Sequence, residues 1–260
     1  MGEFYVFPYL NGSLGRCLFQ VYYAKYYSEV TGLELTYLSQ NDCENLELLA
    51  RLFTNLKNIQ TPENYETLTY PEDSNQSRHP ISTTITSHIQ LRGTPMRYEY
   101  CSHTNLFPNW KNALGPASIQ IIVDVNLVNY ESQKNTWMIH FKEGERLDGY
   151  YASCIDEIPD GKRLHVFGKN SDYSRSMVGN LTKGRNLQVT YSNQELPVAA
   201  LYEMGFCLGG FIGSNSTLSW WGAFYARKRA LDFGHKMPIY YPASCMVIPE
   251  WGKKISNDLT

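Results

Sequence analysis

The pattern that most constrains the fold of this chain is a regular alternation of short apolar runs and longer amphipathic stretches. Residues 3–10, EFYVFPYL, predict a strand, and after the turn NGSLG, residues 16–32 carry apolar side chains at helical spacing until Gly32 ends them. Residues 33–38 predict a second strand and residues 43–59 an amphipathic helix. This order favours an α/β fold with a parallel sheet, because parallel neighbours need a crossover connection that is usually a helix.

The same alternation returns in the second half of the chain. Expected strands cover 135–144, 161–170, 187–192, 209–215 and 237–242, and expected helices cover 150–159, 171–182, 195–208 and 217–229. Between the halves, residues 61–118 are polar and proline-bearing with weak periodicity, which predicts an irregular insertion. Residues 118–128 are apolar enough for a strand or a helix. We therefore expect two domains, residues 1–128 with the insertion, and residues 129–260.

The composition argues against two classes of protein. The chain has 260 residues, 43% hydrophobic and 18% charged, with a formal net charge of -2. It has enough apolar side chains for a core but lacks the basic patch that a nucleic-acid partner needs. No apolar run approaches the roughly 20 residues of a transmembrane helix. The N-terminus lacks the pattern of a signal peptide, so we expect a cytoplasmic protein.

The cysteines and histidines give no indication of a metal site. The six cysteines are scattered without a C-x-x-C pair, which is typical of reduced cytosolic thiols rather than of a disulfide framework or a zinc site. The six histidines include no pair at i, i+4 spacing and no acidic partner at ligand spacing. We expect no metal and no other cofactor.

Residues 213–224, GSNSTLSWWGAF, give the strongest indication of a binding site. An apolar run precedes Ser214, Asn215, Ser216 and Thr217, and two tryptophans follow them. In an α/β sheet, ligands bind at the carboxyl ends of strands, where the next helix begins with unpaired N–H groups that favour an anion. Nearby hydroxyls can donate to phosphate oxygens. The pattern predicts a phosphate site; the alternative is that one of these residues simply caps the helix.

The stretch NSTLSWWGAF resembles the N-S-[ST]-F-S-W-W-x-A motif of the fucosyltransferases related to the α-1,2-fucosyltransferases. The preceding LYEMGFC fits the L-x-x-M-x-x-C helix of that family through Leu201, Met204 and Cys207. The N-terminal NGSLGRCLFQ is similar to the family's G-G-L-G-N-Q-x-F-Q turn. These matches, in the order in which the family has them, extend the resemblance over most of the chain.

Two middle stretches resemble the family more loosely. IHFKEGE stands where the family has a strand ending in H-x-R-R-G-D: His140 matches, Lys142 and Glu143 replace the arginines, and Glu145 replaces the aspartate. LHVFGKNSDY aligns with a strand that enters a Ser-Asp-Asp turn, and there the chain has Gly-Lys-Asn instead. The donor-site motifs therefore depart from the family pattern at charged positions.

The resemblance implies a GT-B-like fold, in which two Rossmann-like lobes face a cleft. It implies an acceptor-side lobe in the N-terminal half and a nucleotide-sugar lobe in the C-terminal half. The implied activity is the inverting, metal-independent transfer of L-fucose from GDP-fucose to a hydroxyl of a glycan acceptor. The donor and the acceptor are then the partners of the protein, with no nucleic acid and no membrane span.

The resemblance also implies roles for individual residues. Lys142 keeps the positive charge that anchors the diphosphate but loses the bidentate fork of arginine. Glu145 is a general base on the acceptor hydroxyl or orients Lys142. His140 is a catalytic base or, as we prefer, a structural histidine that positions the turn. The implied nucleotide contacts are Gly12, Gly15, Arg16, Lys169, Asn170, Asn215, Ser216, Thr217 and Ser219.

Several alternatives stay open at the level of the sequence. Arg16 and Lys169 could offset the arginine that Lys142 replaces, or they are solvated surface charges. Because three donor-site motifs are altered, the same fold could use another nucleotide sugar. A catalytically inactive relative that binds a glycan or a nucleotide is the third interpretation.

Overall fold

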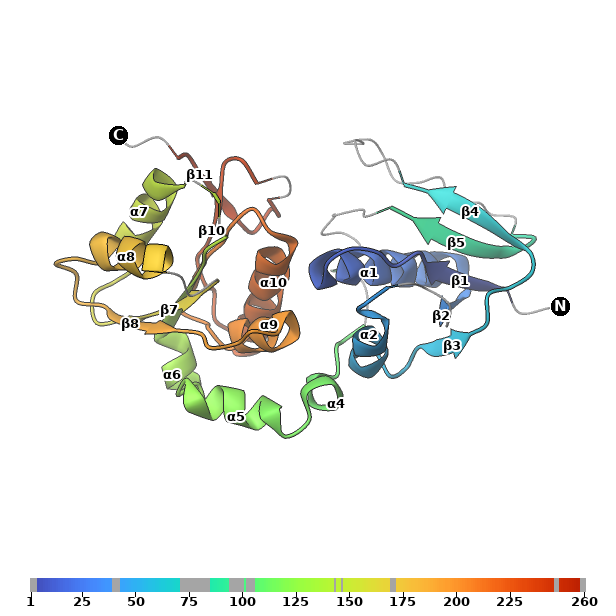
Figure 1. Cartoon of the computed structure of the whole chain (residues 1–260), viewed down its shortest axis with the longest axis horizontal. Helices are drawn as coiled ribbons and strands as arrows, with labels where there is room; N and C mark the ends of the chain where they lie inside the picture. Colours follow the sequence, from blue (N-terminus) through green and yellow to red (C-terminus); the bar gives the residue numbers. More distant parts are fainter. Residues whose placement is uncertain are drawn as a thin grey trace. The chain divides into compact units, whose positions relative to one another are not determined.

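The chain forms two compact units, each with its own sheet of parallel strands. The computed structural model describes residues 4–38, 43–70, 85–93, 101, 106–142, 144–145, 147–168, 172–245 and 248–257. The units are Met1–Ala113 and Leu114–Thr260 (Figure 1). We expected the division after residue 128, but it falls before residue 114. The reason is that helix α5 (Ala117–Asp124) packs against helix α9 (Pro197–Met204) of the second unit.

The first unit contains a sheet with the strand order β3-β2-β1-β5-β4 in the described residues, and every pairing is parallel. Its elements are β1 (Tyr5–Pro8), α1 (Leu14–Thr31), β2 (Glu34–Leu38), α2 (Leu46–Leu52), β3 (Lys57–Ile59), β4 (Tyr65–Thr69) and β5 (His88–Arg92), with α4 (Trp110–Leu114) at the division. Helix α1 packs Tyr23 and Tyr27 against Val6 and Ile89 of the sheet. Gly32 ends α1 at a φ of 74°, a left-handed conformation that favours glycine.

Two expectations for the first unit were wrong. The helix expected over 43–59 stops at Leu52, and Lys57–Ile59 instead forms β3 beside β2. The irregular insertion expected over 61–118 contains β4 and β5, which pair from Tyr65↔His88 onward. Strand β4 lies at the sheet edge with mostly exposed side chains, so its sequence lacks the apolar alternation that identifies a strand.

The second unit contains a sheet with the strand order β11-β10-β9-β6-β7-β8 in the described residues, again parallel throughout. Its further elements are α6 (Tyr130–Lys134), β6 (Thr136–His140), α7 (Asp148–Asp156), β7 (Arg163–Phe167), α8 (Asp172–Leu181), β8 (Gln188–Tyr191), β9 (Gly210–Ile212), α10 (Thr217–Asp232), β10 (Ile239–Pro242) and β11 (Lys253–Ile255). The expected alternation of this half is confirmed. Strand β11 was not expected, and the ambiguous residues 118–128 contain helix α5.

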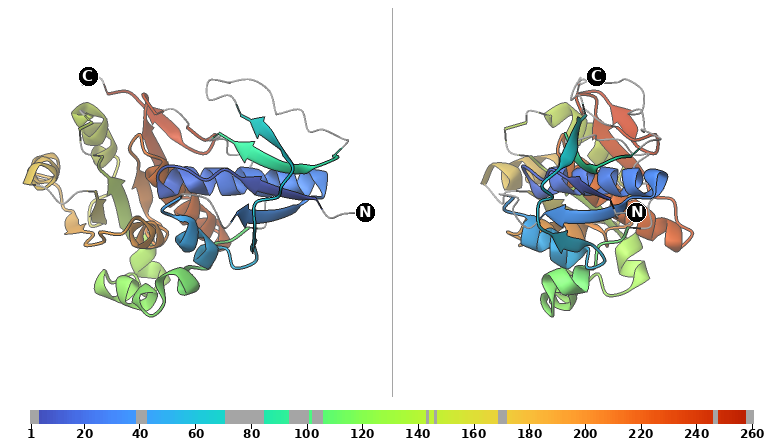
Figure 2. Two further views of the ribbon diagram at one scale, coloured as in Figure 1. Left: turned by 45° about the vertical axis from the view of Figure 1, so that its right-hand side comes forward. Right: turned by 90° about the vertical axis from the view of Figure 1, so that its right-hand side faces the viewer.

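Helices cover both faces of the second sheet. Helices α7 and α8 lie on one face and α9 and α10 on the other (Figure 2). The central strand β6 is buried along its whole length, as is usual where helices cover a parallel sheet on both sides. Trp220 and Trp221 of α10 are 2% and 0% exposed, so the tryptophans of the motif belong to the core. In the part of the chain that the structure describes, no helix is both long and apolar enough to cross a bilayer.

Close packing at Gly210 yields a test of this core. A Cβ atom on Gly210 would lie 2.5 Å from the Trp137 ring, so Gly210→Ala forces β6 and β9 apart. We expect Gly210→Ala to lower the free energy of unfolding by about 1–3 kcal/mol, which is typical of overpacking. Gly179→Ala is the matched control, since Gly179 lies in helix α8 with open space around it, and alanine should stabilise that helix slightly. Urea denaturation of both variants measures the difference; equal stabilities would contradict this packing.

Candidate functional site

A pocket of about 560 Å³ lies in the second unit at the carboxyl ends of β6, β7 and β8. His140, at the end of β6, and Gly168, after β7, form part of its wall. The loop from Ser192 to Glu195 after β8 forms another part. Phe167 at the end of β7, Leu218 of α10 and three residues of α9 complete it. Ligands bind at this edge of open α/β sheets, so the pocket is the principal candidate site of the described residues.

His140 connects the end of β6 to the turn before α10. Its Nδ1 lies 2.9 Å from the Oγ of Ser214, and the two side chains are 8% and 0% exposed. Burial, with a smaller contribution from the positive charge of Lys142, lowers the pKa of His140 to about 4. The imidazole is therefore neutral at pH 7. This geometry fits the structural role that we preferred for His140 from the sequence.

Lys142 and Glu145 contact the backbone of Asn215, Lys142 at its carbonyl and Glu145 at its N–H group. The Lys142 Nζ donates to the Asn215 carbonyl at 3.0 Å and forms an ion pair with Glu145 Oε1 at 3.3 Å. The Asn215 amide donates to Glu145 Oε2 at 3.4 Å. The Lys142 side chain is half exposed, whereas that of Glu145 is 16% exposed. Of the two roles considered for Glu145, these contacts favour the orientation of Lys142.

The hydroxyl groups around the start of α10 have different tasks. Ser216 is the N-cap, and its side chain accepts from the Leu218 amide at 3.2 Å. Ser219, expected as a nucleotide contact, is fully buried and accepts from the Ser214 amide at 3.0 Å. Thr217 is partly exposed, and among the described residues its hydroxyl and its amide have no hydrogen-bond partner. The capping interpretation therefore holds for Ser216. Of the expected nucleotide contacts at this turn, none lines the pocket itself, but Thr217 precedes Leu218, which does.

The turn before α10 is tight because of its glycine. A Cβ atom on Gly213 would lie 2.7 Å from the Tyr241 ring. The buried Tyr150 hydroxyl lies 2.8 Å from the Gly213 carbonyl and 2.9 Å from that of Tyr240, which connects α7 to the residue after β9 and to β10. Tyr150 and His140 therefore both fix the turn that leads into α10.

The remaining residues expected at the site lie elsewhere or outside the described chain. Gly12, at a φ of 81°, Gly15 and Arg16 belong to the first unit, where Gly15 is buried and Arg16 exposed in the first turn of α1. There Gln20 closes the turn, since its side chain accepts from the Asn11 amide at 3.0 Å. Lys169 and Asn170, together with Glu143, lie outside the described residues.

The sequence interpretation missed the loop after β8. Ser192, Asn193, Gln194 and Glu195 line the pocket. Their polar SNQE sequence directly after an expected strand was a usable signal, because the alternation places that strand end beside those of β6 and β7. No group of three His, Cys, Asp or Glu side chains in the described residues is arranged as a metal site.

Comparison with known proteins gives one informative structural likeness. No protein-family model matches the sequence, and no curated protein matches it either. The structure is similar to that of the fucosyltransferase NodZ from Bradyrhizobium, with a TM-score of 0.53 and 12% sequence identity over 86% of this chain and 92% of that chain. At this identity the likeness shows the fold, and the expected α/β, GT-B-like class is confirmed.

The lowered pKa of His140 predicts a pH-dependent stability. Between pH 6.5 and 4 the unfolded chain binds a proton at His140 that the folded chain does not, so stability falls as the pH falls through this window. From pH 7 to pH 5 this residue alone should lower the free energy of unfolding by about 2 kcal/mol. His140→Gln should lack this part of the loss in urea denaturation at the two pH values. His235→Gln, outside the site, should keep it; equal pH dependence in His140→Gln and the unaltered chain would contradict the assignment.

Proposed function

We propose that this chain is a glycosyltransferase that moves a sugar from a nucleotide diphosphate donor to a hydroxyl of a glycan acceptor. The observation that carries the proposal is the pocket at the carboxyl ends of β6, β7 and β8, whose wall includes His140 and Leu218 in the first turn of α10. Lys142 follows His140 by two residues and donates to the Asn215 carbonyl just before that helix. In the reaction the acceptor oxygen bonds to the anomeric carbon, whose bond to the diphosphate breaks with inversion. The acceptor proton passes to a base, and the nucleotide diphosphate leaves with the electron pair.

The main chemical demand of this transfer is to stabilise negative charge on the departing diphosphate. Helix α10 has 16 residues, and the positive end of its dipole is at the pocket side, where Thr217 offers a hydroxyl and an amide. Lys142 adds a cation that Glu145 and the Asn215 carbonyl hold in place. We propose that these groups perform the task without a metal ion.

We propose GDP-fucose as the donor. The motif resemblance at the start of α10 and the fold likeness to a fucosyltransferase both support this choice. The loop Asn193–Glu195 presents amide and carboxylate groups at the pocket, which suit the polar edge of a nucleobase. A different nucleotide sugar is the second candidate. The family pattern has arginine where this chain has Lys142, and here the ion pair with Glu145 partly neutralises the lysine. An inactive nucleotide-binding relative is the third.

A panel of nucleotides separates these candidates. We expect GDP at about 100 times its dissociation constant to raise the melting temperature by about 5 °C, because a ligand that binds only the folded state stabilises it. UDP at the same concentration should have a smaller effect, and GDP-fucose should be slowly hydrolysed. Stabilisation by UDP alone would favour another donor, and no shift with any nucleotide would refute the proposal.

Lys142 is the residue whose removal tests the anion site. Lys142→Ala removes the cation and leaves Glu145 beside the expected diphosphate, so we expect GDP to bind about tenfold to a hundredfold more weakly. Lys142→Arg keeps the charge and should bind GDP equally well or better. The matched control is Lys134→Ala, because Lys134 also pairs with a glutamate three residues away, at 3.1 Å, but lies at the opposite end of β6. Isothermal titration calorimetry measures all four proteins; unchanged affinity in Lys142→Ala would exclude this anchor.

A further inference from the structure

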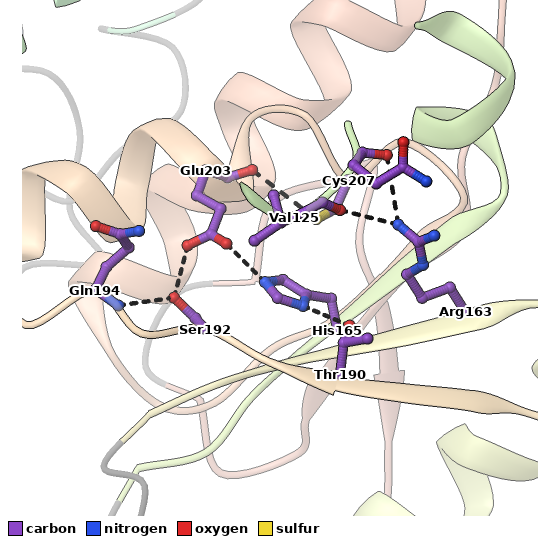
Figure 3. Close-up of polar contacts among 9 residues, drawn as sticks. Val125, Arg163, His165, Thr190, Ser192, Gln194, Glu203 and Cys207 are labelled. Atoms are coloured by element: carbon purple, nitrogen blue, oxygen red, sulfur yellow. Dashed lines mark hydrogen bonds and ion pairs between the residues drawn. The ribbon is translucent and has the colours of Figure 1, made fainter. Parts of the chain in front are cut away.

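A buried polar network joins three elements of the second unit beneath the pocket (Figure 3). The His165 Nε2 of β7 lies 2.8 Å from Glu203 Oε1 of α9, and its Nδ1 lies 2.7 Å from the Thr190 hydroxyl of β8. The second carboxylate oxygen of Glu203 accepts from the Ser192 hydroxyl at 2.6 Å. One histidine and one glutamate thus connect two strands to the helix that follows them.

Burial makes this network unusual. His165 is 1% exposed and Glu203 0% exposed, so neither side chain reaches solvent. A buried carboxylate is costly unless its oxygens are paired, and here His165 and Ser192 occupy one oxygen each. Apolar side chains of similar volume commonly join a strand and a helix at least as stably as a buried ion pair does. Stability alone therefore does not explain why this chain has a histidine and a glutamate there.

The network ends at the wall of the pocket. The Ser192 oxygen also accepts from the Gln194 amide at 3.2 Å, which sets the first turn of the loop after β8. Ser192 and Gln194 both line the pocket, and so does Met204, the neighbour of Glu203 in α9. The orientation of the Ser192 hydroxyl, and with it the course of the loop, depends on the position of the Glu203 carboxylate.

We propose that His165 and Glu203 are positioning residues that hold the Ser192–Glu195 loop in the conformation that accepts the nucleotide of the donor. They act through Ser192 and do not touch the ligand. A loop held in this way before the nucleotide arrives does not have to be ordered by binding, which lowers the entropic cost of association. This inference rests on the proposed function for the identity of the ligand, but the order of the loop is measurable without any ligand.

The first measurement is amide hydrogen exchange of the nucleotide-free protein. Glu203→Gln keeps the shape of the side chain but cannot accept from both His165 and Ser192, so we expect exchange in residues 192–196 to rise about tenfold. Ser192→Ala leaves the His165–Glu203 pair intact and should raise exchange in the same segment, which keeps the test valid if Glu203→Gln folds poorly. The control is Thr136→Val, which removes the 2.7 Å hydrogen bond of a buried threonine to the Ser132 carbonyl at the other end of β6.

The second measurement is the dissociation constant for GDP. We expect Glu203→Gln and Ser192→Ala each to weaken GDP binding about tenfold, and the double variant to bind no more weakly than the weaker of the two, because both break the same connection. Thr136→Val should keep the affinity of the unaltered chain even though it loses stability.

Each outcome separates the two proposals. Unchanged exchange in residues 192–196 in both variants would overturn the positioning role. Raised exchange with an unchanged GDP affinity would overturn it as well. An unaltered chain that binds no nucleotide would refute the proposed function, and one that binds UDP alone would change the proposed donor. In both cases the exchange experiment would still decide whether His165 and Glu203 order the loop.

Discussion

The candidate site depends on the hydrogen bond between His140 and Ser214. It joins the end of the central strand β6 to the turn between β9 and α10, two segments that are 74 residues apart in the sequence. Without it, the Nδ1 atom of His140 and the hydroxyl of Ser214 would be buried and would lack this hydrogen bond. Leaving a buried polar group unpaired commonly costs about 1–3 kcal/mol. With it, the start of α10 has a defined position relative to the carboxyl ends of the strands.

Two further sets of contacts refine that position. The hydroxyl of Tyr150 in α7 contacts the carbonyl groups of Gly213 and Tyr240, and Lys142 and Glu145 contact the backbone of Asn215. The same contacts keep the positive charge of Lys142 beside the start of α10. Glu145 partly neutralises the positive charge of Lys142, and the same ion pair holds the lysine side chain in position. The electrostatic potential at the start of α10 is therefore weaker, but the lysine is better ordered.

The pocket wall contains residues that line the cavity, and these are held in place by buried residues that do not line it. Ser192 and Gln194 line the pocket, whereas His165 and Glu203 are completely buried behind them. The aromatic residues of α10 have a comparable role, because Trp220 and Trp221 fill the core and present the polar start of their helix at the sheet edge. Buried residues of both kinds, polar and apolar, therefore determine where the exposed groups lie.

Most of the second unit could be predicted from the sequence because β6, β7, β9 and β10 are buried along all or nearly all of their length, whereas β11, with more exposed side chains, was missed. Sequence patterns record such burial directly. The first unit was harder, since β4 is an exposed edge strand and β3 pairs with β2 after a short helix. Nothing in the local composition of Lys57–Ile59 distinguishes it from the end of the preceding helix, and only the pairing with a distant strand selects the extended form.

By itself, the sequence determined the alternation of strands and helices, the glycines at the turns, and the hydroxyl-rich start of the tryptophan helix. These are local properties, because periodicity, backbone freedom and capping act over a few residues. Only the tertiary structure decided that Ser219 is buried, that Glu145 orients Lys142, and that Glu203 meets His165 and Ser192 below the pocket. Those contacts join residues from different strands and helices, and their partners are selected by the packing of the sheet rather than by any neighbouring residue.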